Sequence, residues 1–536
     1  MGFVAVSVLP LLIGLHGHDG PGHKHAVRPA AKKKAVVQQF ATGLVYEDRN
    51  WNGKKDADER SLANVRVSSH TDITKTDRNG RWRLPLYDNT IYFVIKPRGY
   101  MTALDQGMQL PRFYYIHNPK GSPAYLKYPA VKPTGPLPAS IDFPLYTRRE
   151  PNKFTALFFG DTQPRDLREV DYISKSIVEP LIGKTDAAFG VTLGDIAFDN
   201  LETTEPLVKS IALIGIPWYN VLGNHDVDYQ GKTDKEANGH FERVFGPAYY
   251  SFDHGPTHFV VLDNVVWQHG DTQPDKRGRY KAGLGKEQLD WLRKDLALVP
   301  QNQMVVLMMH IPLNENEDKQ DIFRMIEKRP YVISVAAHTH FQEHRFFTEK
   351  DGWKGAKPHH HIVNVTTCGS WWSGAPDPRG IPHTTMRDGA PNGYSIFTFD
   401  GTQYKIEYRA AGRPATYQMN IISPDFINAS ELAGTSVFVN VFGGSEQSKV
   451  EVQFGADGPW QTMAKADEAD PMYLELIARE KGQKPPYRDL PGAVKSPHLW
   501  KMPMPRYLAP GVYPIHVRTT DMFGQVYLST RSLRVD

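Results

Sequence analysis

Five short groups of polar residues in the middle of the chain carry the side chains best suited to chemistry. Most of them come directly after an apolar run, as Asp161 follows 157–159 and His310 follows 305–309. Apolar runs of this length are typical of buried strands, so we expect the groups at strand ends along one edge of a sheet. In chain order, they are Gly160-Asp161-Thr162-Gln163, Gly194-Asp195, Gly223-Asn224-His225-Asp226, His310 and His338-Thr339-His340.

These groups combine carboxylates, imidazoles and amides, which together suit a site for two metal ions. Two ions about 3.5–4 Å apart can hold the attacking and leaving oxygens of an in-line displacement at phosphorus. Such a site needs a carboxylate that bridges the ions, and mixed oxygen and imidazole ligands suit Mn, Fe or Zn. Glycines at 160, 194 and 223 allow sharp turns where a ligand must point inward. The residues therefore predict a metal-dependent phosphoester hydrolase.

The five groups, in this order, resemble the pattern of the calcineurin-like metallophosphoesterase superfamily. The resemblance covers about residues 152–409. It implies a four-layered α/β/β/α domain, in which a hydroxide activated by two metals attacks the phosphorus of a phosphomonoester or phosphodiester. His225 is implied as a catalytic residue near the substrate, and Asp226 as a residue that orients His225 or its loop. The implied ligands are Asp161, Gln163 and His340 for the first metal, Asn224, His310 and His338 for the second, and Asp195 as the bridge.

Two positions depart from the usual superfamily pattern. The first group commonly reads Asp-x-His, whereas here it reads Asp161-Thr162-Gln163, and an amide oxygen is a weaker donor than an imidazole. We therefore expect weaker binding of the first metal, or a preference for a harder ion such as Mn. The last group commonly begins with glycine and here begins with Ala337, which is small enough to have little effect. The substrate of Asp-x-His members is not assumed for this chain.

Apolar patterning predicts several domains, as is usual for 536 residues. Strand-like runs alternate with helices, including helices over 167–181 and 286–298, in a central α/β domain at 149–412. Alternating apolar residues predict a β-sandwich at 37–148 and another at 413–536. Within the second sandwich, 466–504 is predicted to be an irregular insertion with six prolines. These flanking sandwiches, and the segments 369–372 and 388–394, resemble bacterial calcineurin-like phosphoesterases with dedicated N- and C-terminal domains.

Residues 1–36 are interpreted as a signal segment followed by a flexible leader. An apolar run from Phe3 to Leu15 has the length of a signal-peptide core and is too short to span a membrane, although a basic start and a clean cleavage site are missing. We expect a secreted or periplasmic protein without a transmembrane anchor. The net charge of +4 is small and dispersed, so no nucleic-acid partner is expected. The single cysteine, Cys368, excludes an internal disulfide.

The segment after the last metal group carries aromatic and charged residues suited to line a substrate pocket. In an extended chain, adjacent tryptophans face opposite sides, one toward the core and one toward the pocket. Cationic or hydrogen-bonding groups nearby suit a phosphate oxygen or the rest of the substrate. An ordinary loop between strands is the alternative interpretation. The candidate substrate-binding residues are Trp371, Trp372, Arg379, His383 and Asp388.

The N-terminal domain contains the pattern of a calcium loop. Its oxygen-bearing residues have the spacing of an EF-hand loop, with Gly53 at the sixth position. However, a strand-like run at 42–46 precedes it where an EF-hand has a helix, and Lys54 and Lys55 dilute its negative charge. The sequence leaves a structural calcium site and a polar hairpin loop as open interpretations. The candidate ligands are Asp48, Asn50, Asn52, Asp56 and Glu59.

Three consecutive histidines at 359–361 precede an apolar run at 362–365. Because imidazoles bind metals, a third metal site is one interpretation. The polar entrance of a strand over 362–365 is favoured over it.

The sequence as a whole predicts a secreted two-metal phosphoesterase that acts on a small or surface-exposed phosphoester. The choice between a monoester and a diester stays open, because His225 is compatible with both. The alternative is a non-catalytic cell-surface binding protein in which the catalytic core is a relic. The intact Asn224–His225 pair and the three histidines of the last two groups favour the enzyme.

Overall fold

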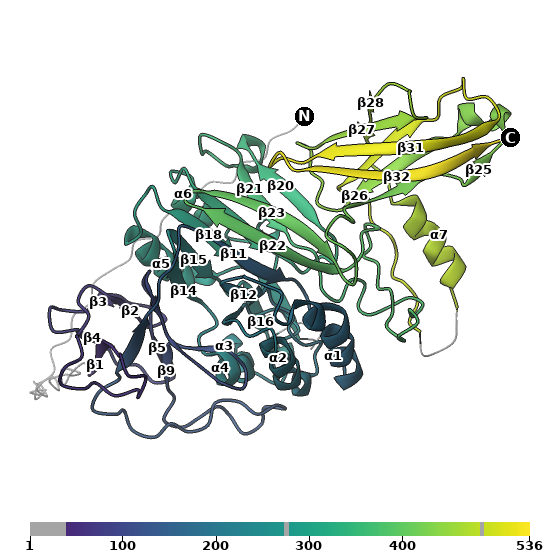
Figure 1. Cartoon of the computed structure of the whole chain (residues 1–536). Helices are drawn as coiled ribbons and strands as arrows, with labels where there is room; N and C mark the ends of the chain where they lie inside the picture. The colour runs from purple at the N-terminus through teal and green to yellow at the C-terminus, as the bar shows by residue number, and fades with distance from the viewer. Residues whose placement is uncertain (1–38, 273–277, 483–486) are drawn as a thin grey trace, which may run out of the picture. The chain divides into compact units, whose positions relative to one another are not determined.

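The computed structural model of the chain describes residues 39–272, 278–482 and 487–536. The predicted signal segment and leader at 1–36 lie outside the described residues. Within the described part, none of the helices is long and apolar enough to cross a membrane. The described sheets fall into an N-terminal, a central and a C-terminal set (Figure 1).

The central part of the chain contains two large sheets. The first consists of β11 (Lys153–Phe159), β12 (Phe189–Thr192), β13 (Trp218–Asn220), β22 (Gly393–Asp400) and β23 (Gln403–Ala410). The second consists of β14 (Tyr250–His254), β15 (Thr257–Val261), β18 (Met304–Met308), β19 (Val332–Ala336), β20 (Glu343–Phe347) and β21 (His359–Val363). Their strand orders are β13-β12-β11-β22-β23 and β14-β15-β18-β19-β21-β20. β11, β12 and β13 are parallel, as are β15, β18, β19 and β21, so carboxyl ends gather at one edge of each sheet.

The two central sheets pack face to face, and helices cover their outer faces. In β11, Phe158 points into the core between the sheets, whereas Phe159 belongs to the core beneath the helices. Across the interface, Phe259 of β15 lies 5.1 Å from Phe189 of β12, measured between ring centres. This alternation is the expected pattern for a strand buried on both faces. The predicted four-layered α/β/β/α sandwich is confirmed.

The described helices of the central part are short. They are α1 (Leu167–Ile173), α2 (Thr204–Ala212), α3 (Asp234–Ala237), α4 (Gly239–Phe245), α5 (Gly285–Ala297) and α6 (Lys319–Ile326). α1 and α2 pack side by side (Figure 1), and α5 agrees with the helix predicted over 286–298. The helix predicted over 167–181 is wrong as one α-helix, because α1 passes into a π-helix at Ser174–Val178 and a 3-10 turn at Glu179–Leu181. Pro180 has no N–H to donate, and the Ser174 hydroxyl donates back to the Val170 carbonyl, so regular α-helix bonding ends here.

The N-terminal set forms two facing four-stranded sheets. Their strands are β1 (Phe40–Glu47), β2 (Arg66–Ser68), β3 (Ile73–Lys75), β4 (Arg81–Pro85), β5 (Thr90–Val94), β6 (Tyr100–Met101), β9 (Tyr114–His117) and β10 (Phe143–Thr147). The strand orders are β4-β1-β10-β6 and β3-β2-β5-β9. Trp82 of the first sheet packs on Tyr92 of the second at 5.8 Å between ring centres, and both are buried. A small hairpin of β7 (Ala103–Leu104) and β8 (Pro111–Arg112) accompanies them.

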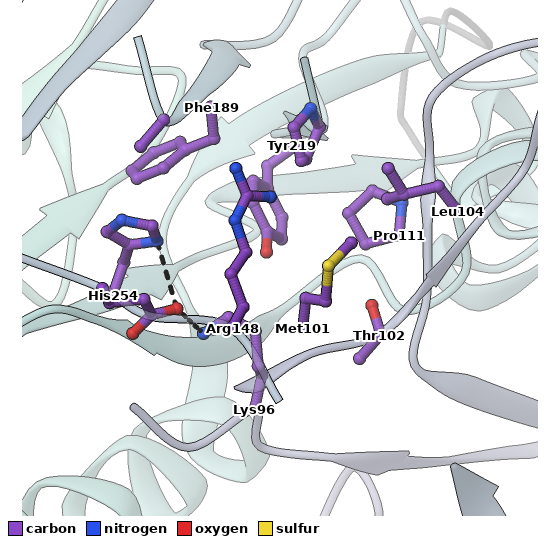
Figure 2. Close-up of a pocket in the computed structure, with 12 residues that line it drawn as sticks. Lys96, Met101, Thr102, Leu104, Pro111, Arg148, Phe189, Tyr219 and His254 are labelled. Carbon is purple, nitrogen blue, oxygen red and sulfur yellow. Dashed lines mark hydrogen bonds and ion pairs between the residues drawn. The ribbon is translucent and has the colours of Figure 1, made fainter. Parts of the chain in front are cut away.

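A small polar cavity lies between the N-terminal strands and the central strands. Lys96 and Glu150 form a buried ion pair there, with Nζ 2.7 Å from Oε1, and His254 Nδ1 lies 3.4 Å from the same oxygen. Figure 2 shows Lys96 and His254 at this cavity beside Phe189 and Tyr219. Its volume is about 20 Å³, room for about one water molecule. The cavity is therefore part of a structural junction and too small for a substrate.

The C-terminal set also forms two facing sheets. Their strands are β24 (Met419–Ile422), β25 (Phe426–Ile427), β26 (Ser436–Val441), β27 (Lys449–Phe454), β28 (Gln461–Thr462), β29 (Ala464–Lys465), β30 (Leu499–Pro503), β31 (Gly511–Thr520) and β32 (Val526–Val535). Between β29 and β30, the insertion predicted to be irregular contains a helix, α7 (Pro471–Glu480). Asp470 caps this helix by accepting the Tyr473 N–H at 2.8 Å, and proline is well suited to the first helical position. The high proline content of the insertion concealed this helix.

Candidate metal centre

The predicted metal groups come together where the parallel strands of the two central sheets end. Asp161 lies just beyond β11, and Asp195 just beyond β12, while His310 and His338 follow β18 and β19. Asp195 has a φ of 51° and His338 a φ of 72°, in the left-handed region that non-glycine residues rarely adopt. Strained backbone of this kind persists where the surroundings hold it, and it gathers at functional sites.

A glycine is needed where two of these groups approach each other. A Cβ atom on Gly223 would lie 2.0 Å from the backbone nitrogen of Asp195. No other residue fits at this distance, so Gly223 allows the Asn224–His225 loop to lie against Asp195. The His225 N–H then donates to Asp195 Oδ1 at 2.9 Å.

The tightest part of the cluster surrounds His310. Its Nε2 lies 3.2 Å from Asp195 Oδ1, 3.1 Å from Asn224 Oδ1 and 3.1 Å from His338 Nδ1. The ligand atoms of Asp195, His310 and His338 all lie within 4.8 Å of one another. One imidazole nitrogen has a single proton or a single lone pair, so it cannot satisfy three such partners. A cation held between them can.

The other side of the cluster contains Asp161, Gln163 and His340. Asp161 is fully buried, and its Oδ1 has no hydrogen-bond partner among the described residues. His340 Nε2 lies 3.7 Å from this oxygen, while His340 Nδ1 donates to the Gly369 carbonyl at 2.6 Å. Gln163 Nε2 donates to Asp195 Oδ2 at 2.6 Å. Rotation of the carboxamide would turn its oxygen toward the cluster instead.

Backbone carbonyls orient two of the imidazoles. His310 Nδ1 donates to the Leu193 carbonyl at 2.9 Å, as His340 Nδ1 does to Gly369. In each ring, the proton is thereby fixed on Nδ1 and Nε2 faces the cluster. Such bonds typically orient histidines that bind metal.

Charges in the cluster are strongly coupled because it is buried. Burial raises the pKa of Asp161 to about 7, an effect that the nearby Asp195 charge increases and His310 opposes. Burial also favours neutral Asp195, but His310 and His225 outweigh it and lower the pKa of that carboxyl. Burial lowers the pKa of His338 to about 4 and of His340 to about 3. Neutral His338 and His340 and an ionised Asp195 are forms that bind metal. Burial also lowers the pKa of His310, but the Asp195 charge outweighs burial and raises that pKa to about 9.

The donor set fits divalent metal ions. It offers two carboxylates, three imidazoles and two amides, of which Asp161 Oδ1 is buried and without a partner. An unpaired buried oxygen is costly, and an ion bound to it removes that cost. Mixed nitrogen and oxygen ligands suit Mn, Fe or Zn. The chemistry of the residues therefore agrees with a site for divalent metal ions, and the choice of Mn, Fe or Zn stays a prediction.

His225 has a partner that the sequence pattern did not reveal. Its Nδ1 donates to Asp199 Oδ1 at 2.6 Å, and the Tyr229 hydroxyl donates to the same oxygen at 2.5 Å. Burial by itself lowers the pKa of His225, but the charges of Asp195 and Asp199 outweigh it, so the pKa is raised. The only sequence signal is that Asp199 lies in the same loop as Asp195, four positions later.

Asp226 holds its loop and not the His225 ring. Its Oδ1 accepts the Ala197 N–H and its Oδ2 accepts the Gly223 N–H, both at 2.9 Å. Asp226 is buried, and burial raises the pKa of its carboxyl to about 7. Of the two roles implied for Asp226, the structure supports the orientation of the loop.

Three family models match the chain in the order of its domains. The N terminal of Calcineurin-like phosphoesterase matches residues 49–130, Calcineurin-like phosphoesterase matches 154–342, and the C terminal of Calcineurin-like phosphoesterase matches 361–527. The chain belongs to the calcineurin-like phosphoesterases. The predicted family, with its dedicated N- and C-terminal parts, is confirmed. The protein is thus a metal-dependent phosphoesterase in general terms, and its family implies divalent ions at this cluster.

Solved structures show more distant similarities. Purple acid phosphatase PPD1 from yellow lupin (Lupinus luteus) seeds is 14% identical, with a TM-score of 0.35 over 70% of this chain and 73% of that chain. The extracellular domain of the one component system BT4673 from B. thetaiotaomicron is 12% identical, with a TM-score of 0.13 over 30% of this chain and 19% of that chain. TM-scores this low do not establish a shared arrangement. No curated protein matches the chain.

The two adjacent tryptophans of the phosphoesterase face different surroundings. The Trp371 ring stacks on His340 at 3.9 Å between ring centres and is partly exposed. Trp372 is buried, and its Nε1 donates to the Thr162 carbonyl at 3.2 Å. Both residues have a φ of 54°, so the chain is left-handed here and not extended. Trp371 therefore borders the metal centre, and Trp372 anchors the segment in the core.

The structure does not bring the other three candidate pocket residues into the metal cluster. Asp388 is fully buried, and its Oδ2 accepts from His498 Nε2 at 2.9 Å, within the C-terminal part of the chain. His383 Nε2 lies 3.0 Å from Glu480 of α7. Arg379 pairs at 2.8 Å with the carboxylate two positions before it. These residues connect the segment after Trp372 to itself, to the C-terminal insertion and, through the Gln342 N–H that Asp388 accepts at 2.8 Å, to the loop of His340.

The predicted calcium loop is a tight polar turn after β1. The buried Asp48 carboxylate accepts two backbone N–H groups of the loop, at 2.8 and 2.7 Å. Asp56 Oδ2 accepts from the amides of Asn50 and Asn52, both at 2.8 Å, and Glu59 accepts the N–H of residue 49 at 2.8 Å. Among the described residues, three metal-binding side chains gather only at the metal centre. The contacts therefore suit the polar-loop interpretation, and a calcium site stays a prediction.

Proposed function

We propose that this phosphoesterase hydrolyses a phosphomonoester or phosphodiester at a centre of two divalent ions. One observation carries the proposal: three ligand atoms crowd His310 Nε2, beside the unpaired buried oxygen of Asp161. A purely structural cluster would satisfy these groups by hydrogen bonds within the protein. In a metal site, the bound ions satisfy these groups instead.

The ligands divide into two sets around Asp195. Asp161, Gln163 and His340 lie on one side of it, and Asn224, His310 and His338 on the other. Asp195 contacts both sets, through Oδ2 to Gln163 and through Oδ1 to His310. We assign Asp195 as the bridging ligand for this reason. When bound, the two ions supply Lewis acidity and lower the pKa of water.

His225 is placed to hold a proton near the substrate. Its Nε2 lies 4.0 Å from Asp195 Oδ2, at the edge of the cluster, and Asp199 fixes its other nitrogen. With both nitrogens protonated, Nε2 can stabilise phosphoryl charge or donate its proton to the leaving oxygen. Asp199 keeps the ring oriented and favours its charged form. We assign His225 as catalytic and Asp199 as a positioning residue.

Export also belongs to the proposal. The apolar run from Phe3 to Leu15 supports a secreted or periplasmic location, where a surface phosphoester or small phosphorylated molecule would be the substrate. The domain limits at 148/149 and 412/413 likewise stay predictions. The flanking sandwiches would then tether or shape the central domain.

Hydrolysis of p-nitrophenyl phosphate and bis(p-nitrophenyl) phosphate by the protein supplied with Mn tests the function. We expect turnover of at least one of them and close to two metal ions per chain by elemental analysis. No turnover of either, with less than one ion per chain, would instead support the non-catalytic binding protein. The ratio of the two rates decides between a monoesterase and a diesterase.

A further inference from the structure

One border of the metal centre is a continuous row of contacts from His340 to His225. Trp371 stacks on His340 at 3.9 Å, and its carbonyl accepts from Arg165 Nη1 at 2.9 Å. The Arg165 guanidinium carbon lies 4.0 Å from the ring centre of Phe198. Phe198 in turn stacks on His225 at 4.3 Å. Arg165 is therefore the cation in the middle of this border.

Phe198 separates Arg165 from the catalytic histidine. His225 is nearly parallel to the Phe198 ring, with 18° between the planes, and Arg165 also lies directly over that ring. Two groups at these distances cannot share one face of a ring, so they occupy opposite faces. The Phe198 ring thus lies between the Arg165 guanidinium and a phosphoryl group held beside His225. Arg165 is placed for a different group of the same substrate.

The charge around Arg165 is incompletely balanced. Glu169 is buried and lies with Oε2 3.8 Å from Arg165 Nη1, while its Oε1 accepts from the Arg488 guanidinium. Glu169 therefore serves two guanidinium groups, while Asp199, which attracts Arg165 more weakly, pairs with His225. Within the described part of the chain, the hydrogen bonds of the Arg165 guanidinium use Nη1, which leaves Nε and Nη2 for a ligand. A partly exposed arginine with two spare donors suits an anion.

Arg488 reaches this border because the C-terminal insertion is docked on it. The Gly374 N–H donates to the Arg488 carbonyl at 2.8 Å. Glu480, at the end of α7, accepts the Ala375 N–H at 2.9 Å and contacts His383 at 3.0 Å. These contacts hold the insertion against the segment that begins with Trp371. The C-terminal part of the chain thus supports the border of the centre.

We propose, on the basis of the proposed function, that the substrate carries a second anionic group beside the scissile phosphoester. Arg165 binds this group, and Glu169 and Arg488 hold Arg165 in place. A carboxylate and a phosphate both match the planar donors of a guanidinium. The C-terminal insertion therefore takes part in the choice of substrate, whereas the ligands and His225 carry the hydrolysis.

Paired substrates test the proposal. 3-Carboxyphenyl phosphate and its methyl ester have similar leaving groups and differ in one negative charge, and 1,3-phenylene bisphosphate offers a phosphate instead. We expect kcat/KM to be about tenfold or more higher for the carboxylate or the bisphosphate than for the methyl ester, through KM, as one charge-assisted contact allows. The better of the two identifies the second anion as carboxylate or phosphate. If the methyl ester is hydrolysed with the same kcat/KM as the carboxylate and the bisphosphate, the proposal is overturned.

Variants assign the preference to Arg165. Arg165→Gln should abolish it, Arg165→Lys should restore part of it, and Arg488→Gln should reduce it. Arg168→Gln is the matched control, because this arginine lies on α1 with 59% of its side chain exposed, and among the described residues its ion pair is with Asp166. Arg168→Gln should keep the preference. An unchanged preference in Arg165→Gln, at the metal content of the parent protein, overturns the assignment.

A binding measurement separates this proposal from the proposed function. Calorimetry compares (3-carboxybenzyl)phosphonate with benzylphosphonate, neither of which can be hydrolysed, on the parent protein and Arg165→Gln. If the parent protein binds (3-carboxybenzyl)phosphonate more tightly than benzylphosphonate, and Arg165→Gln does not, the proposal is supported even if no phosphoester turns over. Equal binding of both phosphonates by the parent protein overturns it even if p-nitrophenyl phosphate is hydrolysed.

Discussion

Among the described residues of the phosphoesterase, two of the buried groups of histidines on or beside the six-stranded sheet differ in their partners. His310 and His340 belong to the metal centre, together with Asp161 and Asp195. The second histidine cluster, on β20 and β21, is defined as His344, His359, His360 and His361. Its polar contacts run to hydroxyls, other imidazoles and the Leu313 N–H, and they include no carboxylate among the described residues. The two groups share burial and residue type, and they differ in charge.

Hydrogen bonds inside the second histidine cluster form a consistent neutral set. The Leu313 N–H donates to His361 Nε2 at 3.2 Å, so His361 carries its proton on Nδ1 and donates to Ser334 Oγ at 2.7 Å. The Ser334 hydroxyl then donates to His359 Nε2 at 2.8 Å. His360 lies between His344 and the Tyr404 hydroxyl, at 2.9 and 2.6 Å. Each nitrogen in these contacts has one partner and needs no cation.

The difference teaches that buried imidazoles alone do not make a metal site. In the metal centre, acceptors outnumber the protons available, and an unpaired carboxylate oxygen remains. In the second histidine cluster, hydroxyls pair with several of the ring nitrogens. His359 Nδ1 is buried without a partner among the described residues, but it carries the proton of its ring and offers a cation no lone pair. Burial lowers the pKa of these rings, to about 4 in His344 and about 3 in His359, and leaves them neutral.

The largest expected effect is the loss of the bridging carboxylate. Asp195→Asn should lower turnover of p-nitrophenyl phosphate by about a thousandfold or more, because Asp195 serves both ions. Metal content should fall as well, as measured by elemental analysis after gel filtration. His359→Gln is the matched control in the second histidine cluster, where the amide can still accept from Ser334. Metal content that falls equally in both variants would erase the distinction between the two groups.

The proton role of His225 should have the next largest effect. His225→Asn should lower kcat by about a hundredfold, and Asp199→Asn by less, because general acid catalysis contributes about 10²–10⁴-fold. Both variants should keep their metal, since neither side chain is assigned as a ligand. Steady-state kinetics with matched metal analysis checks this. A change confined to KM would assign the pair to binding instead.

The second histidine cluster should make folding sensitive to acid. Its folded pKa values are lowered, so below about pH 6.5 the unfolded chain takes up protons that the folded chain does not. Stability is complete above pH 6.5 and falls toward pH 4, by about 2 kcal/mol per ring at pH 5. Urea unfolding of the metal-free protein at several pH values measures this. His359→Gln should have a shallower pH dependence, and an equal slope would count against neutral His359.

Gln163 should have the smallest effect at the metal centre. Gln163→Ala should weaken binding of one ion by about tenfold, and added Mn should restore turnover, because Gln163 serves one ion only. Gln163→His should tighten Zn binding. Titration with Mn and Zn, followed by activity, measures both. A loss as large as that of Asp195→Asn would contradict the bridging assignment of Asp195.

The sequence was sufficient to predict that these residues come together, because they form contiguous groups at strand ends. Asp161 and His310 each follow an apolar run, so local patterning and the parallel sheets together imply their meeting. The Asp199–His225 contact joins positions 26 apart and arises from the path of two loops. No local pattern encodes it.

Other predictions were wrong because tertiary contacts, which the local sequence does not show, decide where these residues lie. Residues 359–361 were predicted as the polar entrance of a strand, yet they lie within β21 and are buried. A run of three histidines suggests an exposed segment. Ser334, the Leu313 N–H, the Tyr404 hydroxyl and His344 of β20 supply the partners that make its burial possible. α7 was missed because proline suggests a loop, although Pro471 occupies the position where a helix tolerates it. Asp388 was predicted at the pocket, and its partner His498 comes from a distant strand region.

The docking of the C-terminal insertion has a consequence for the growing polypeptide. Synthesis delivers the last metal ligand, His340, and the strands β22 and β23 before α7 and Arg488 exist. Under both proposals, the nascent central domain can become a hydrolase while Arg165 still lacks the support of Arg488. Full selectivity would then be the last property that this chain acquires, and a chain cut after β23 would hydrolyse phosphoesters with a weaker preference for a second anion.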